Sequence, residues 1–191
     1  MRQREDVERV SSTQQSMETI TDKIQKALNL FHEYSGVLVQ HPVLADLMEA
    51  YQKAIQESWD LMNKLRIPAT CHYCATQIPG GGCCGKGVDD WYDEYLLLIN
   101  LLMGVTLPSE RTLDDSCIFL GTEGCMLAAR YHFCVNYLCR RITADITSHE
   151  EDRLKRTYGH ELHLSWLIEK ELRRVISSHG PDRNSTVIFR Q

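Results

Sequence analysis

All eight cysteines of this 191-residue chain lie between Cys71 and Cys139, and the segments on either side contain none. In a reducing compartment, thiols gathered in one stretch are more often metal ligands or redox groups than structural disulfides. A stretch that serves a metal must fold so that its sulfurs converge, and this constrains the chain more than any other feature. In order, the cysteines are Cys71, Cys74, Cys83, Cys84, Cys117, Cys125, Cys134 and Cys139.

The first four cysteines have spacings that suit a metal site. Cys71 and Cys74 form a Cys-x-x-Cys turn, and the adjacent pair Cys83-Cys84 follows within a glycine-rich stretch. A Cys-x-x-Cys turn directs two thiolates to one ion and leaves backbone amides free to bond the sulfurs, so it occurs in both zinc and iron-sulfur sites. All eight cysteines are candidate metal ligands. The pairings stay open, since eight thiolates suit two four-thiolate sites or one such site with spare thiols.

The later cysteines have a recognisable local context. Cys117 precedes Phe119-Leu120, Cys125 follows a glycine, and Arg130 precedes Cys134 and Cys139. With the opening Cys-x-x-Cys and Cys-Cys pair, this order resembles the YkgJ-type cysteine-cluster family, a zinc- or iron-chelating domain. The resemblance covers residues 71–139. It implies chelation of zinc or iron and names a class of cofactor rather than a reaction, because the family has no settled general activity.

Thiolate ligands do not indicate whether zinc or iron is bound, because they suit both metals. The cofactor expected is therefore an iron-sulfur cluster, for example of the four-iron type, or zinc. His72 and His132 lie inside the cysteine region, where an imidazole could replace a thiolate. On one regular helix Cys134 and Cys139 would point about 140° apart, so they converge only if the helix is interrupted between them.

Hydrophobic periodicity predicts an all-α fold. Apolar residues at helical spacing indicate one helix over residues 20–31, which Gly36 and His41-Pro42 should end, and a second, strongly amphipathic helix over residues 44–65. From Ile67 onward, prolines and glycines predict a loop that carries the first four cysteines. Another helix is expected from Asp89 to Met103, with four acidic residues in its first turn: Asp89, Asp90, Asp93 and Glu94.

The remainder of the chain continues this helical pattern. Residues 117–139 predict a loop that leads into a helix. A long last helix should begin at a capping box of Ser148 with Glu151 and end at Gly180-Pro181. We therefore expect one compact domain, a helical bundle enclosing a cysteine-rich segment. Its parts are an N-terminal helical hairpin (1–66), the cysteine-cluster region (67–142) and a C-terminal helix with its tail (143–191).

Several other readings of the sequence are weak. Residues 80–87 have the spacing of a phosphate-binding loop, but Gly87 stands where a Ser or Thr must hold magnesium. The acidic residues at 89–94 are more typical of a helix start than of a site for a hard metal. His160 and His163 lack the spacing of a zinc hydrolase and are expected in solvent.

Charge and hydropathy limit the partners. A net charge of -5 argues against nucleic-acid binding as the main task. The longest apolar run, residues 96–103, is far shorter than the roughly 20 residues that span a bilayer. Residues 1–15 lack the apolar core of a secretory signal, so a cytoplasmic location is expected. A redox or protein partner remains open, as does a homodimer through the second helix.

The sequence thus predicts a metal-binding protein that chelates an iron-sulfur cluster or zinc, in redox chemistry, sensing or metal handling. One alternative is an iron-sulfur enzyme with a substrate pocket among the helices, lined by Tyr92, Tyr95 or His132. Another is a structural zinc module that displays a surface for protein interaction. Whether the chain is an enzyme stays undecided at this point.

Overall fold

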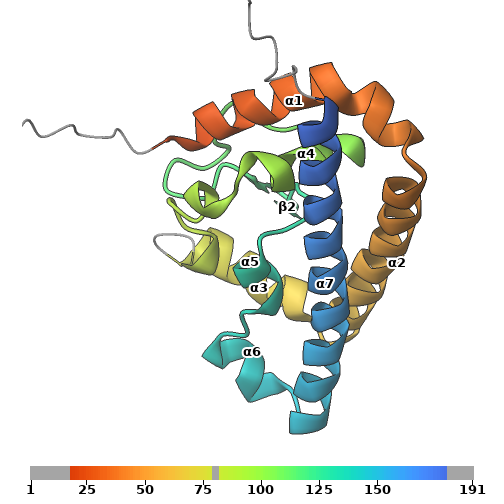
Figure 1. Cartoon of the computed structure of the whole chain (residues 1–191). Helices are drawn as coiled ribbons and strands as arrows, with labels where there is room; N and C mark the ends of the chain where they lie inside the picture. The colour runs from red at the N-terminus through yellow and green to blue at the C-terminus, as the bar shows by residue number, and fades with distance from the viewer. Residues whose placement is uncertain (1–17, 79–81, 180–191) are drawn as a thin grey trace, which may run out of the picture.

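The computed structural model describes residues 18–78 and 82–179, and its fold is all-α as the sequence predicts (Figure 1). The predictions made for residues 1–15 and for a helix end at Gly180-Pro181 lie outside these residues. The α-helices are α1 (Ile20–Gln40), α2 (Pro42–Lys64), α3 (Ile67–Gln77), α4 (Glu94–Leu102), α5 (His132–Asn136), α6 (Arg140–Asp145) and α7 (Ser148–His179). Two 3-10 helices, η1 (Gly82–Cys84) and η2 (Asp89–Trp91), and a hairpin of β1 (Leu120–Gly121) and β2 (Gly124–Cys125) complete the structure.

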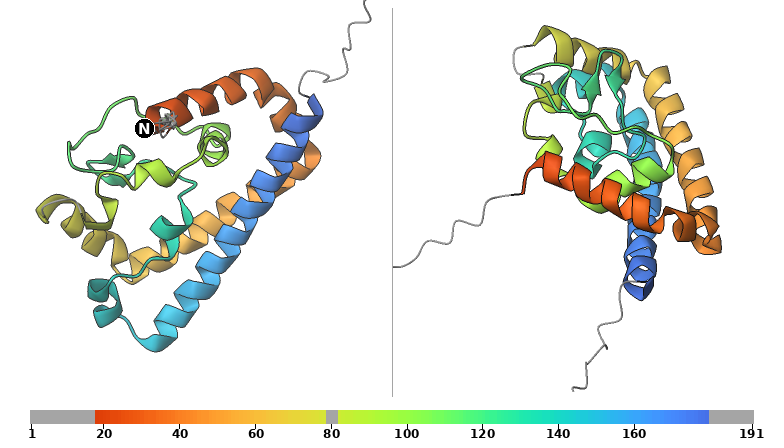
Figure 2. Two further views of the ribbon diagram at one scale, coloured as in Figure 1. Left: turned by 60° about the vertical axis from the view of Figure 1, so that its left-hand side comes forward. Right: turned by 90° about the horizontal axis from the view of Figure 1, so that it is seen from above.

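Four long elements form a frame around the cysteine region. Helices α2 and α7 lie side by side along most of their length, and α1 packs along α4 at one end of that pair (Figures 1 and 2). The faces of these helices that meet are apolar, as their helical spacing requires. Their shared core is built from Tyr34, Leu38, Leu44, Tyr51, Ala54, Ile55, Leu98, Ile99, Leu164, Ile168, Leu172 and Val175.

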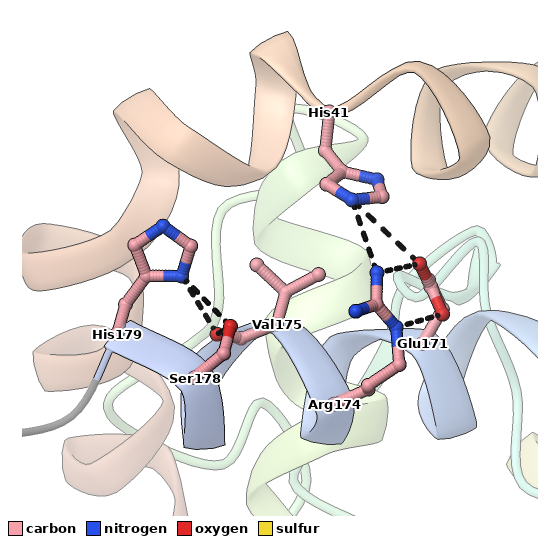
Figure 3. A network of polar contacts seen from close by, with 6 residues as sticks. All are labelled: His41, Glu171, Arg174, Val175, Ser178 and His179. Carbon is pink, nitrogen blue, oxygen red and sulfur yellow. Dashed lines mark hydrogen bonds and ion pairs between the residues drawn. The ribbon is translucent and has the colours of Figure 1, made fainter.

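The corner between α1 and α2 is tied to the last turns of α7. His41 ends α1 and precedes Pro42, whose ring suits the first turn of α2. Figure 3 shows its imidazole Nε2 facing Arg174, at 3.2 Å, and the Glu171 carboxylate, at 3.7 Å. Arg174 in turn pairs with Glu171 at 2.6 Å. The break expected at His41-Pro42 is confirmed, and polar contacts hold it against α7.

The break expected at Gly36 is wrong, because α1 continues to Gln40. Beyond its own helix backbone, nothing lies within 4 Å of the place where a Cβ of Gly36 would stand, so no close contact requires a glycine there. On either side of it, Tyr34 and Leu38 are buried in the core. Their burial outweighs the cost of about 1 kcal/mol that a glycine brings to a helix interior.

Two helices begin a few residues away from their predicted first residues. The capping box of α7 is formed by Thr147 and Glu150, one position before the predicted pair, with the Thr147 amide donating to the carboxylate at 2.8 Å. Helix α4 begins after Asp93, whose carboxylate accepts from the amides of Tyr95 and Leu96. Asp89 therefore does not belong to the first turn of α4, contrary to the expectation.

The predicted loop from Ile67 is also wrong, because residues 67–77 form helix α3. Pro68 lies in its first turn, where a missing amide costs nothing. Ile67, Cys74 and Ala75 are its buried residues, which shows that the cysteine takes part in the apolar face. Among the described helices, none combines the length and apolar character needed to cross a membrane.

Candidate metal centre

Cysteine side chains surround a cavity of about 140 Å³ between α3, η1, the β-hairpin and α5. The lining is mostly apolar and includes Trp59, Phe119 and Phe133. All eight cysteines are free thiols. The six that line the cavity come from five separate segments of the chain: Cys71, Cys83, Cys84, Cys117, Cys125 and Cys134.

Helix α3 presents Cys71 and Cys74 on one face, since residues three apart lie one turn from each other. The next cysteines are brought to this face by Gly82, which opens η1 with a φ of 58°. A Cβ at Gly82 would lie 3.2 Å from the Cβ of Cys74, so both the backbone conformation and the close approach favour glycine. Cys83 follows directly and therefore lies beside α3.

Backbone pairing joins Cys84 to Cys117. The Cys117 amide donates to the Cys84 carbonyl at 2.8 Å, and a bridge between Gly85 and Ser116 extends the pairing. Two buried polar groups hold the adjoining loop, because the Asp89 carboxylate accepts from the Ile118 amide at 3.1 Å and pairs with Arg111 at 2.5 Å. Asp89 is thus a fully buried carboxylate that shapes the centre, and its oxygens already bind these two partners.

The hairpin and α5 supply the next two thiols. In the hairpin, Cys125 pairs with Leu120. Because Cys117 lies three residues before Leu120 in the chain, this pairing brings Cys125 close to Cys117. Cys134 lies in α5 and receives a weak hydrogen bond from the buried Tyr92 hydroxyl at 3.9 Å. The same hydroxyl accepts from the Tyr131 amide at 3.0 Å, so Tyr92 fixes the start of α5 against the cavity wall.

Cys134 and Cys139 do not share one regular helix. Helix α5 ends at Asn136, and Cys139 lies at the N-terminus of α6. The interruption that convergence requires is therefore present. Cys139 packs with Cys71 against a core cluster that also contains Ile67 and Tyr158.

The histidines of the region differ in position. His72 lines the cavity. His132 is exposed and stacks on Tyr131 with ring centroids 4.1 Å apart. His160 and His163 are exposed on α7, as expected. Of the aromatic residues proposed for a substrate pocket, Tyr92 lines the cavity, whereas Tyr95 lies under the Arg173 guanidinium at 3.7 Å from ring centroid to Cζ.

Burial keeps these thiols protonated in the unmetallated protein. It raises the pKa of Cys71 to about 11 and that of Cys117 to about 12. The pKa values of Cys83, Cys84, Cys125 and Cys134 rise for the same main reason. Since only thiolates bind metal, occupation of the site must release protons.

The sequence analysis does not predict that two charged residues near the centre are buried. Arg130 is 4% exposed, lines the cavity and stacks on Trp59, with Cζ 4.4 Å from the ring centroid. Its Nη2 donates to the Met62 sulfur at 3.8 Å, while its buried Nε has no partner. The Glu161 carboxylate of α7 is fully buried beside Ser58 and Arg130, and neither of its oxygens has a hydrogen-bond partner. Glu161 lies in register with the apolar stripe of α7, between Tyr158 and Leu164, so its helical spacing indicates the buried face although its residue type does not.

The donors are near one another without forming a closed set for one ion. Within residues 18–78 and 82–179, no three His, Cys, Asp or Glu side chains are close enough to hold a metal ion in their present positions. In the comparisons with known proteins, no protein family, no curated protein and no solved structure matches the chain.

Proposed function

We propose that this chain is a metal-binding protein whose cysteines hold an iron-sulfur cluster or zinc, in a redox, sensing or metal-handling role. One observation carries the proposal: six cysteine side chains from five separate segments line one cavity. Structural disulfides would pair the thiols, but all eight are free. A reducing compartment such as the cytoplasm is part of the proposal, since it keeps thiols available as ligands.

The charge of Arg130 supports a bound thiolate centre. A buried guanidinium costs several kcal/mol unless an anion compensates it. The nearest thiols that feel its charge are those of Cys71, Cys125 and Cys134, and as neutral thiols they offer no compensation. A metal converts these thiols to thiolates, so that Arg130 faces negative charge. Glu161 is the other nearby acid, but it makes no hydrogen bond to the guanidinium.

The spacing of the donors favours a cluster over a single zinc ion. Zinc holds each sulfur at about 2.3 Å, so four thiolates must crowd around one point. The six cysteines that line the cavity are instead distributed over its wall. A cluster of several irons spaces its cysteine ligands more widely and needs a cavity, which the structure provides.

Backbone amides near the sulfurs suit such a cluster. The amides of Phe119 and Leu127 act as donors toward Cys117 and Cys125 and lower the pKa of these thiols against the effect of burial. Hydrogen bonds to cluster sulfurs stabilise the negative charge of the centre and tune its reduction potential. When bound, the cluster would supply one-electron chemistry, and these residues would orient and stabilise it.

A second function is an iron-sulfur enzyme that binds a substrate in the same cavity. The observation in its favour is the wall of aromatic side chains, among them Trp59, Phe133 and Tyr137, next to the Arg130 guanidinium. A small carboxylate with an apolar body would match this wall. Saturable binding of benzoate to the metal-loaded protein, lost in Arg130→Met, would favour the enzyme.

The experiment is purification of the full chain without oxygen, followed by measurement of iron, acid-labile sulfide, zinc and visible absorption. The expected result is brown protein that contains iron and sulfide and is bleached by dithionite. Stoichiometric zinc without visible bands would make the centre structural or hydrolytic. A folded protein that takes up none of these metals would contradict the proposal.

A further inference from the structure

We propose that the eight cysteines form two adjacent four-thiolate metal sites, joined by the peptide bond between Cys83 and Cys84. The inference rests on the proposed function and extends it, because it assigns every thiol and leaves none spare. The first set consists of Cys71, Cys74, Cys83 and Cys139. The second set consists of Cys84, Cys117, Cys125 and Cys134.

The first set is assembled by α3, η1 and the start of α6. Cys71 and Cys74 share a face of α3, and Gly82 packs so closely on Cys74 that an added Cβ would lie 3.2 Å from the Cys74 Cβ, which places Cys83 beside them. Helix α6 packs against α3, and Cys139 lies at its N-terminus. Three chain segments thus meet at one place, and each contributes one or two cysteines to the first set.

The second set is assembled around the hairpin. The hydrogen bond from Cys117 to Cys84 and the pairing of Cys125 with Leu120 bring three of its members together. Tyr92 links the fourth, since its hydroxyl bonds both Cys134 and the amide that precedes α5. All four members line the cavity, whereas the first set contributes only Cys71 and Cys83 to that lining.

Apolar packing divides the thiols in the same way. Cys71 and Cys139 pack against the cluster that contains Ile67 and Tyr158. Cys84, Cys117 and Cys125 belong to a different cluster, around Phe119 and Tyr92. This division agrees with the backbone pairing, although it depends on side-chain contacts and not on hydrogen bonds.

The electrostatic surroundings of the thiols follow the same partition. The charges that act on Cys71 come foremost from Cys83, Cys139 and Cys74. Those that act on Cys117 come from Asp89, Cys125 and Cys134. Interaction between the sets is strongest at the junction, where Cys84 feels Cys83 most, and it also includes Cys84 with Cys71 and Cys134 with Cys83. The two sites would therefore be neighbours, an arrangement suited to electron transfer between them.

The test compares the metal content of variants that each lose one ligand. Full-length protein is reconstituted without oxygen, in separate samples, with ferrous iron plus sulfide and with zinc. Cys139→Ser removes a ligand of the first set and Cys134→Ser one of the second, and both residues are only partly buried. Thr76→Ala is the matched control, since Thr76 lines the cavity but carries no candidate metal ligand. Circular dichroism checks the helices of every variant.

Each single variant is expected to keep about half of the metal bound by the parent protein, and the double variant almost none. Thr76→Ala should keep all of it. Loss of all metal in one variant and none in the other would overturn the partition, because it is the result of one site with spare thiols. Absence of metal in the parent protein would instead refute the proposed function. If either variant is misfolded, Cys74→Ser and Cys125→Ser repeat the comparison.

Discussion

At the scale of single residues, Arg130 links the cavity to the helical frame. Its guanidinium stacks on Trp59 from α2 and lies in the wall beside the thiols of Cys71, Cys125 and Cys134. In the unmetallated protein this cation is buried without an ion pair, which is a cost, whereas beside a thiolate centre it is compensated. Arg130 should therefore destabilise the empty protein and stabilise the occupied one.

Arg130→Met is expected to weaken metal retention about 10-fold, the effect typical of losing a partner outside the ligand shell. The same substitution should cost the empty protein little stability, because it replaces a buried charge that has no ion pair with an apolar chain of similar length. The favourable effect of Arg130 on Glu161 is lost at the same time and offsets part of this gain. The measurements are metal transfer to a chelator and urea unfolding of the metal-free protein. Arg130→Lys, which keeps the charge, should retain metal better than Arg130→Met; equal loss in both variants would contradict a role for the charge.

Glu161 gives a prediction about pH. Burial raises its pKa above the ordinary value of 4.5, and this effect exceeds the lowering by Ser58 and Arg130. The groups that face it are Ser58 and Tyr51 from α2, Arg130, and Tyr158 from its own helix. A raised pKa means that the folded state binds the proton more tightly than the unfolded state. The contribution of Glu161 to the stability of the folded state is thus fully present below the pKa of the unfolded state. It is lost as the pH rises through the pKa of the folded state.

Glu161→Gln should therefore be more stable than the parent protein at neutral pH and should show a flatter decline of stability from pH 4.5 upward. Each unit of pKa difference between the folded and unfolded states corresponds to about 1.4 kcal/mol. Urea unfolding of the metal-free protein at a series of pH values measures this. Glu57→Gln, at an exposed position of α2, is the control. If the stabilities of the parent and Glu161→Gln changed in parallel with pH, Glu161 would have the same pKa in the folded and unfolded states, and the prediction would be wrong.

At the scale of elements, Asn100 of α4 holds the segment that carries Arg130. This fully buried side chain donates to the carbonyls of Leu96 and Ala129 and accepts from the amides of Ala128 and Ala129. The distances are between 2.8 and 3.0 Å. The amide of one side chain therefore fixes the backbone immediately before Arg130.

Asn100→Ala is expected to destabilise the protein by about 3 kcal/mol, because it leaves several buried backbone groups without partners. It should also weaken metal retention, since Arg130 loses its support. Asn136→Ala, at the exposed end of α5, should change neither property. Urea unfolding and chelator transfer measure the two effects, and a change below 1 kcal/mol on Asn100→Ala would be inconsistent with this role.

The elements also show where sequence patterns suffice and where they do not. The long amphipathic stripes of α2 and α7 are predictable, because helical spacing directly reflects burial against a partner. Helix α3 was missed because its buried face depends on Cys74 acting as an apolar residue, as free cysteine does in cores. When the cysteines are counted as apolar residues, a helical spacing is seen for Ile67, Cys71, Cys74 and Ala75. Pro68 suits the first turn of this helix.

Other features of the site have no local signal. All eight cysteines could be named as candidate ligands from their clustering, and the structure brings six of them to one cavity. The burial of Arg130 and Glu161, however, depends on the packing of distant elements, although Arg130 is part of the resemblance and Glu161 lies in register with the apolar stripe of α7. The grouping of the thiols likewise depends on backbone pairing between Cys84 and Cys117, which are far apart in the chain.

At the scale of the whole molecule, the frame and the cysteine region differ in what holds them together. The largest frame cluster, which includes Tyr51, Leu98 and Ile168, contains no cysteine among its buried members. The other two clusters contain Cys117 and, packed against them, Cys71, Cys84, Cys125 and Cys139. Apolar burial alone can stabilise the frame, whereas the packing around the cavity would include the metal ligands themselves.

Removal of metal should therefore loosen the molecule in one part only. We expect amide hydrogen exchange in residues 82–91 and 117–139 to accelerate at least 10-fold when a chelator empties the reconstituted protein, a change of about 1.4 kcal/mol in local opening. Exchange in residues 44–55 of α2 and 164–175 of α7 should change little, because the frame cluster that they build contains no cysteine. Hydrogen exchange followed by mass spectrometry of peptides from both regions measures the difference. Equal acceleration in the frame would mean that the metal centre and the frame unfold as one cooperative unit.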